Sequence, residues 1–149
     1  LNFKWVDDFK DFYPILIENK KKHKARPTHS QLELEKLQKT FPNEVLQLML
    51  YSNEIPIAGM TTFKANKKGA IIFYSMFDYA YSNLQPVALL MQYIIHWAKK
   101  NSLQFIDYGI SHQPNEKNPL APNKSLIKFK EEFGCFASIR NTYQKNLND

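Results

Sequence analysis

The chain lacks the sequence features of disulfide cross-links, membrane-spanning segments and flexible linkers. It has one cysteine, Cys135, among 149 residues, so an internal disulfide is excluded and a cysteine-based metal cluster has no ligand set. No apolar run approaches the roughly 20 residues that span a bilayer, and no secretory signal is visible. Gly/Ser-rich linkers are also absent. We therefore expect a cytoplasmic protein in a reducing setting.

The composition is that of a globular protein. Hydrophobic residues make up 44% and charged residues 23% of the chain, which is long enough to bury a core. We expect a single domain over residues 1–149. The chain opens with Leu1 rather than Met, so we also expect it to be the C-terminal part of a longer protein.

Positive charge is concentrated in one short segment. The net charge is +6, and residues 20–26 read KKKHKAR. Such a cluster can attract phosphates of a nucleotide cofactor or of RNA, including tRNA. It equally fits a solvated helix end, because cations are favoured near a helix C-terminus. Both interpretations remain open from the sequence.

Helical spacing marks the N-terminal third. Apolar residues between positions 3 and 22 predict a first helix. A second helix begins at Ser30, which forms a capping box with Glu33, and it stops at Pro42. We therefore expect two helices before the first strand.

The rest of the chain alternates between strand and helix signals. Three β-rich runs with short turns predict an antiparallel meander, followed by a helix, a strand, a helix and a last strand. The segments are residues 45–51, 55–65 and 69–78, a helix from Pro86, and residues 103–110, 124–133 and 135–143. The helix between the third and fourth strands makes a right-handed crossover, so these strands should be adjacent and parallel. We predict a mixed α/β domain of the α+β class, with two N-terminal helices on a central mixed sheet.

Two motifs near the C-terminus carry a family resemblance. Residues 107–111 read DYGIS at a strand end, and residues 123–134 read NKSLIKFKEEFG through a helix. In order and spacing, and together with PTHS at 27–30, TFP at 40–42 and IAG at 57–59, they resemble the GNAT-fold N-acyltransferases related to the Fem peptidyltransferases. This group is FemAB-like, or acetyltransferase-like.

The resemblance implies a fold, an activity and partners. In the GNAT fold the third and fourth strands of our prediction splay apart at one end, and the acyl donor lies in the gap. The implied activity moves an acyl or aminoacyl group to the amine of an amino sugar, peptide or small metabolite. The donor would be acyl-CoA or aminoacyl-tRNA. The alternative is a non-catalytic half of a tandem GNAT protein that serves substrate binding or scaffolding. The partner of the chain would be a preceding GNAT-like half or a second copy in a homodimer.

Candidate site residues follow from these motifs. They are His29 and Asp107 as catalytic residues, Gly109, Ser111, Asn123 and Lys130 for substrate, and Phe77, Asn83 and Gln85 for cofactor. His29 equally fits a residue packed on the sheet before a helix, and Asp107 a carboxylate that caps a turn. No pair of histidines has metal-ligand spacing, so we expect no metal.

One departure from the family pattern affects the donor. Acetyl-CoA GNAT proteins carry a glycine-bearing loop before the long helix, whose amides hold the pyrophosphate. Residues 81–86 read YSNLQP here, without glycine, and Pro86 lacks an N–H. We therefore expect CoA to bind weakly or not at all.

Overall fold

The computed structural model describes the chain except for residues 23, 114–117, 119–120, 140–144 and 146–149. The chain divides into two compact units, Leu1–Gly109 and Ile110–Asp149. The first unit contains the sheet. The second contains the helix α4 (Lys124–Glu131).

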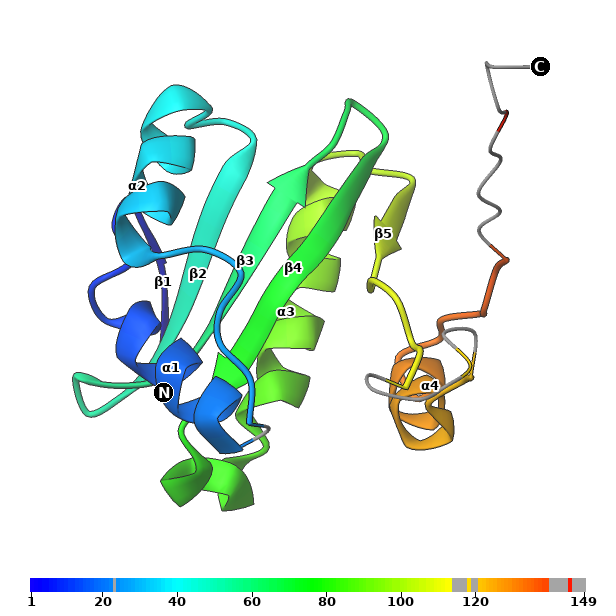
Figure 1. Cartoon of the computed structure of the whole chain (residues 1–149). Coiled ribbons are helices and arrows are strands. Elements are labelled where there is room, and N and C mark those ends of the chain that lie inside the picture. The colour runs from blue at the N-terminus through cyan, green and yellow to red at the C-terminus, as the bar shows by residue number, and fades with distance from the viewer. Residues whose placement is uncertain (23, 114–117, 119–120, 140–144, 146–149) are drawn as a thin grey trace. The chain divides into compact units, whose positions relative to one another are not determined.

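A five-stranded mixed sheet organises the first unit, in the order β1-β2-β3-β4-β5 (Figure 1). Its strands are β1 (Asn2–Val6), β2 (Val45–Ser52), β3 (Ile55–Lys64), β4 (Gly69–Phe77) and β5 (Phe105–Asp107). Neighbours from β1 to β4 are antiparallel, whereas β5 is parallel to β4. The antiparallel meander and the adjacent parallel strands predicted from the sequence are both confirmed.

Helices cover both faces of this sheet. The helix α1 (Phe12–Lys22) packs on β3 and β4, and α2 (Gln31–Thr40) packs on β2, on the same side of the sheet (Figure 1). The long helix α3 (Pro86–Lys100) lies on the other side and contacts β2, β3, β4 and β5. A short 3-10 helix, η1 (Tyr79–Leu84), joins β4 to α3. The mixed α+β class is thereby confirmed.

The core under α1 and α2 is aromatic and aliphatic. Its buried residues are Phe9, Phe12, Ile15, Leu16, Leu34, Val45, Met49, Tyr51 and Tyr74. Under α3, Leu90 and Ile94 are fully buried. Each helix therefore contributes one apolar stripe, as expected for helices that cover a sheet.

Local sequence signals explain where several elements begin. The Ser30 hydroxyl accepts from the Glu33 N–H at 3.3 Å, and the Glu33 carboxylate accepts from the Ser30 N–H at 2.7 Å. These hydrogen bonds lower the pKa of Glu33, because they favour its charged form. Between β2 and β3, Asn53 and Glu54 both have positive φ, as a tight hairpin turn requires.

The predicted helix over residues 3–22 is wrong in its first half. Residues Asn2–Val6 form β1, which pairs with β2 from Asn2↔Tyr51 to Val6↔Gln47. Short apolar runs fit either period, and here the hydrogen-bond ladder with β2 decides the outcome. The helix begins only at Phe12, so Pro14 falls in its first turn, where a missing N–H is tolerated.

The C-terminal strands also differ from prediction. The run at 103–110 forms only a short strand, Phe105–Asp107. For the predicted strand 135–143, residues 135–139 are described and are not in a strand. Residues 140–143 lie outside the described part of the chain. The predicted helix at 124–133 is confirmed as α4, and Gly134 beyond it has a positive φ of 77°.

Gly59 lets α1 approach the middle of the sheet. A Cβ on Gly59 would collide with the Phe12 ring, and it would lie 2.7 Å from Met49 Sδ and 2.9 Å from Gln47 Nε2. All three neighbours are fully or almost fully buried, so they have little room to move.

Replacing Gly59 with alanine should therefore destabilise the protein by about 1–3 kcal/mol through overpacking. Urea denaturation of the variant measures this loss. The double variant G59A/F12L should lose less than the sum of the two single variants, because leucine removes ring atoms that the new methyl meets. A G59A protein with an unchanged free energy of unfolding would contradict the packing described here.

Candidate functional site

The strands β4 and β5 pair only at the start of β4. Their register is Gly69↔Phe105, Ala70↔Ile106 and Ile71↔Asp107. The strand β4 continues to Phe77, so its second half has no β5 partner. The ladder between the two parallel strands thus ends at Asp107, and the splayed gap implied by the family resemblance stays a prediction.

A bulge interrupts β4 where the separation begins. Thr62 pairs with Ile72 and Thr61 with Tyr74, which leaves Phe73 as an extra residue. Bulges bend a strand and increase its twist. The rings of Phe73 and Tyr74 contact each other with centroids 4.7 Å apart, although adjacent side chains in a regular strand point to opposite faces. The bulge therefore gathers two aromatic rings at this point.

His29 lies against this bulge. Its ring meets Phe73 edge-on, with centroids 5.5 Å apart. The Tyr13 hydroxyl donates to the His29 carbonyl at 3.3 Å, and the Thr28 N–H donates to the Tyr74 hydroxyl at 3.2 Å. The Nδ1 atom of His29 is buried and finds no hydrogen-bond partner among the described residues. Buried polar atoms are normally paired, so this nitrogen is an exception.

Asp107 lies at the end of β5. Its Oδ1 atom accepts a hydrogen bond from the Gly109 N–H at 2.7 Å, so the carboxylate stabilises the turn that follows the strand. Gly109 has a φ of 73°, a conformation that favours glycine. A Cβ there would lie 3.7 Å from the Ile72 carbonyl, which is an ordinary contact. The backbone conformation, rather than crowding, accounts for this glycine.

The two proposed catalytic residues border the same strand. His29 contacts Phe73, and Asp107 pairs in register with Ile71, two residues earlier in β4. His29 lies in the segment before α2, and Asp107 lies on β5, the last strand in the sheet order. The sheet therefore brings both to the region where β4 loses its β5 partner.

The cofactor candidates lie at the other end of β4 and after it. The Phe77 carbonyl accepts from the Asn19 amide at 2.6 Å, so its backbone holds α1. Asn83, in η1, is exposed. Gln85 is also exposed and adopts a left-handed conformation, with φ 49° and ψ 52°, directly before α3.

The first turn of α3 offers few amides to an anion. Pro86 is its first residue and has no N–H. The N–H groups of Ala88 and Leu89 both donate to the Gln85 carbonyl, at 3.0 and 3.3 Å. Val87 supplies the remaining N–H of this turn. Few amides are therefore free at this turn, and weak CoA binding stays a prediction.

The second unit brings together three of the proposed substrate-binding residues. The Lys130 ammonium donates to the Ser111 hydroxyl at 2.8 Å and to the Ile110 carbonyl at 3.0 Å. The Asn123 N–H donates to the Ser111 carbonyl at 2.9 Å. The Asn123 side chain also caps α4 by accepting from the Leu126 N–H. These contacts hold the loop to the helix, so the motif has a structural role within its own unit.

The basic segment at 20–26 lies at the end of α1, and its His23 is outside the described residues. The Lys20 ammonium lies 5.7 Å from the Tyr74 ring centroid, and that of Lys22 lies 3.4 Å from the Tyr79 ring centroid. Lys21 pairs with Glu18. These contacts fit the helix-end interpretation, and RNA binding stays a prediction.

Sequence reasoning missed part of this site. Tyr74 and Ser75 belong to it because they lie on the unpaired half of β4, and the Ser75 hydroxyl is buried without a partner among the described residues. The only sequence signal for these residues was the adjacent bulky pair Phe73 and Tyr74, followed by Ser75 as the one polar side chain of the strand. That pattern does not reveal a bulge.

Among the described residues, no group of three His, Cys, Asp or Glu side chains could hold a metal ion. Over the same part of the chain, no helix is long and apolar enough to cross a membrane.

Several solved structures with the same fold are acetyltransferases by name. A possible acetyltransferase from Clostridium difficile 630 is 12% identical, with a TM-score of 0.72 over 98% of this chain and 97% of that chain. An aminoglycoside antibiotic 6'-N-acetyltransferase from Acinetobacter baumannii is 15% identical, with a TM-score of 0.65 over 97% of each chain. A ribosomal-protein-alanine N-acetyltransferase from Brucella melitensis biovar Abortus 2308 is 10% identical, with a TM-score of 0.66 over 98% of each. At these identities the likeness concerns the fold, and it confirms the GNAT fold predicted from the sequence.

Comparison with curated proteins gave no match. The model of the FemAB family, by contrast, matches residues 9–139, which include both C-terminal motifs and every site candidate. The chain therefore belongs to the FemAB family.

Proposed function

We propose that this chain is an N-acyltransferase domain that moves an acyl group from a donor to an amine. The observation that carries the proposal is the end of the β4–β5 pairing close to His29, whose ring contacts Phe73 of β4. FemAB membership and the shared GNAT fold support it. Fold alone would not, because one fold can host many functions.

Acyl transfer to an amine has three requirements. An amine must lose a proton as it attacks, the carbonyl oxygen must be stabilised as it gains charge, and the leaving group must depart. His29 is the proposed base, since its partly exposed ring lies against Phe73 of β4 and a neutral imidazole can accept the proton of an attacking amine. Backbone N–H groups of the unpaired half of β4 are the proposed donors to the carbonyl oxygen. Asp107 holds the turn at the end of β5, next to the last residue pair with β4.

The names of the similar structures favour an acyl-CoA donor, since those compared are acetyltransferases, and nothing among them supports aminoacyl-tRNA. The acceptors in their names, an aminoglycoside and a ribosomal-protein alanine, share an amine. For this chain we propose an amine-bearing small molecule or peptide as acceptor. We further propose that residues 1–149 act as one domain of the enzyme.

Weak CoA binding is the first expected result. The first turn of α3 offers Val87 as its free amide donor, so the dissociation constant of CoA should be at or above about 1 mM, the upper end of common substrate affinities. Calorimetry at moderate salt measures it. The variant P86G restores an N–H and should bind severalfold more tightly. One-to-one binding of the unchanged protein in the low micromolar range would show that the missing amides do not matter.

The second expected result is a loss of activity in a His29 variant. With acetyl-CoA and a panel of amines, H29Q should lower kcat by about 10²–10⁴-fold, the usual contribution of a general base, with little change in KM. Mass spectrometry of the acylated amine gives the rate. The matched control is H96Q, because His96 is exposed on α3 and, among the described residues, bonds only Gln92 of its own helix. If no acyl-CoA or charged tRNA supports turnover with any amine, the proposed function is refuted and a non-catalytic role is favoured.

A further inference from the structure

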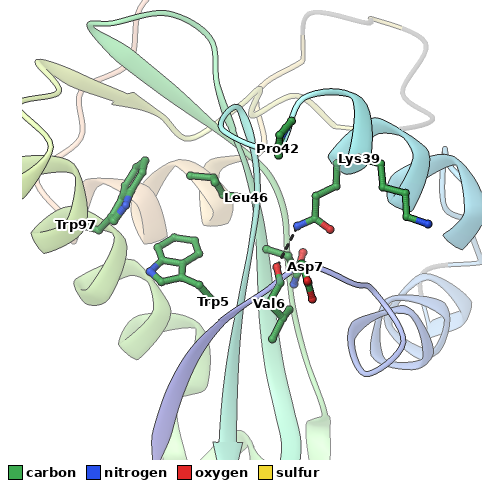
Figure 2. Close-up of a pocket in the computed structure, with 9 residues that line it drawn as sticks. Trp5, Val6, Asp7, Lys39, Pro42, Leu46 and Trp97 are labelled. Atoms are coloured by element: carbon green, nitrogen blue, oxygen red, sulfur yellow. Dashed lines mark hydrogen bonds between the residues drawn. The ribbon is translucent and has the colours of Figure 1, made fainter.

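Two features of the first unit are not used by the acyl-transfer chemistry. One is a hollow of about 730 Å³ that is lined by the end of β1, the end of α2 and the last turns of α3 (Figure 2). Its Trp5 and Trp97 rings already contact each other, with centroids 5.6 Å apart, so the hollow points to no particular ligand. The other feature is the basic segment at 20–26, and its charges do point to one.

The basic segment carries more positive charge than the residues around it neutralise. Lys21 pairs with Glu18. No ion pair with a described residue is formed by the other lysines and the arginine, which are Lys20, Lys22, Lys24 and Arg26. The dipole of α1 favours cations in its last turn, which accounts for Lys20 and Lys22. Lys24 and Arg26 lie beyond the helix, so the helix end does not explain them.

Lys24 occupies a backbone position that glycine usually fills. Its φ is 52°, and its N–H donates to the Lys21 carbonyl at 2.9 Å. The Ala25 N–H donates to the Lys20 carbonyl at 2.9 Å, which completes the hydrogen-bond pattern of a Schellman motif. Glycine is favoured at this point of the motif, because a left-handed conformation is unfavourable for residues with a Cβ. The charge of Lys24 is therefore the feature that needs an explanation.

The free cations border the proposed acyl-transfer site. The Lys20 ammonium lies 5.7 Å from the Tyr74 ring centroid. Tyr74 contacts Phe73, and the His29 ring lies against Phe73. Arg26 is three residues from His29, and three residues of extended chain span at most about 11 Å. A small molecule can therefore reach the proposed base and the basic segment together.

One carboxylate also lies near His29. The Glu33 carboxylate accepts from the Ser30 N–H and from the Ser30 hydroxyl, at 2.7 and 2.9 Å. These hydrogen bonds lower the pKa of Glu33, and the nearby His29 lowers it further. Charges of both signs thus surround His29, with the positive sign in excess. An acceptor that carries an ammonium and an anionic group matches both signs.

We propose that the acceptor is a small amine that also carries an anionic group, a carboxylate or a phosphate. This inference rests on the proposed acyltransferase function. Lys24 and Arg26 bind the anionic group, and the amine nitrogen lies at His29. The acyl carbon bonds this nitrogen as its bond to the donor breaks, the electron pair of that bond leaves with the donor, and the amine proton goes to His29. The anionic group takes no part in these steps and positions the amine.

Three acceptors of similar length test the charge requirement. β-Alanine carries a carboxylate, O-phosphoethanolamine a phosphate, and propylamine neither. The full chain is assayed at low salt with a fixed concentration of acetyl-CoA, and mass spectrometry gives the apparent kcat/KM. We expect at least one anionic acceptor to exceed propylamine about tenfold, with a preference that falls as salt rises. The more active of the two identifies the anion. Equal values for all three acceptors overturn the inference and leave the proposed function intact.

Two variants remove the cations that the inference uses. K24G should not unfold the protein, because glycine favours the backbone conformation of Lys24. K24G and R26Q should each lower kcat/KM for the anionic acceptor about two- to fivefold, the effect of an exposed charge pair, and leave propylamine within about twofold. The matched control is K99Q, because Lys99 is exposed at the end of α3, on the other side of the sheet. An unchanged preference in the double variant K24G/R26Q overturns the inference.

A binding measurement separates this inference from the proposed function. Isotope-labelled protein is titrated with β-alanine and with O-phosphoethanolamine, and amide chemical shifts are followed. Saturable shifts confined to residues 24–29, lost in K24G/R26Q, support the inference even if no acceptor is acylated. No saturable shift in this segment, together with no turnover, overturns both the inference and the proposed function.

Discussion

The strand β4 is hydrogen-bonded along its length on one side and only at its start on the other. Its pairing with β3 runs from Ala70 to Phe77, whereas its pairing with β5 ends at Ile71. Unpaired backbone groups in the middle of a fold need partners, and a polar ligand can supply them. The proposed position of the acyl-transfer site follows from this one-sided pairing. The bulge at Phe73, the turn held by Asp107 and the placement of His29 all occur within a few residues of the point where the pairing stops.

Packing under α1 and α2 holds this region in place. Gly59 admits the Phe12 ring to the sheet, and that ring contacts Tyr74 next to the bulge. The Tyr74 hydroxyl accepts from the Thr28 N–H, which fixes the segment that carries His29. The aromatic core thus positions the candidate base through a short series of contacts.

Local signals in the sequence predicted the elements that depend on local chemistry. The capping box at Ser30, the first-turn position of Pro86 and the turn before β3 each reflect hydrogen bonds within a few residues. The parallel pair β4 and β5 followed from the length of the connection. The strand β1 was missed because its apolar residues fit a helix as well, and only distant β2 decides between them. Tertiary packing produces the bulge, the unpaired Nδ1 atom of His29 and the hollow beside Trp5. No local sequence pattern therefore predicts these features.

The central claim is that an acyl donor binds where β4 and β5 separate. A titration of isotope-labelled protein with acetyl-CoA, followed by amide chemical shifts, tests it directly, since this method detects millimolar affinities. The account predicts shifts confined to the second half of β4, to Asp107–Gly109 and to the first turn of α3. Shifts concentrated at β1 and the end of α2, or none at saturating donor, would contradict it.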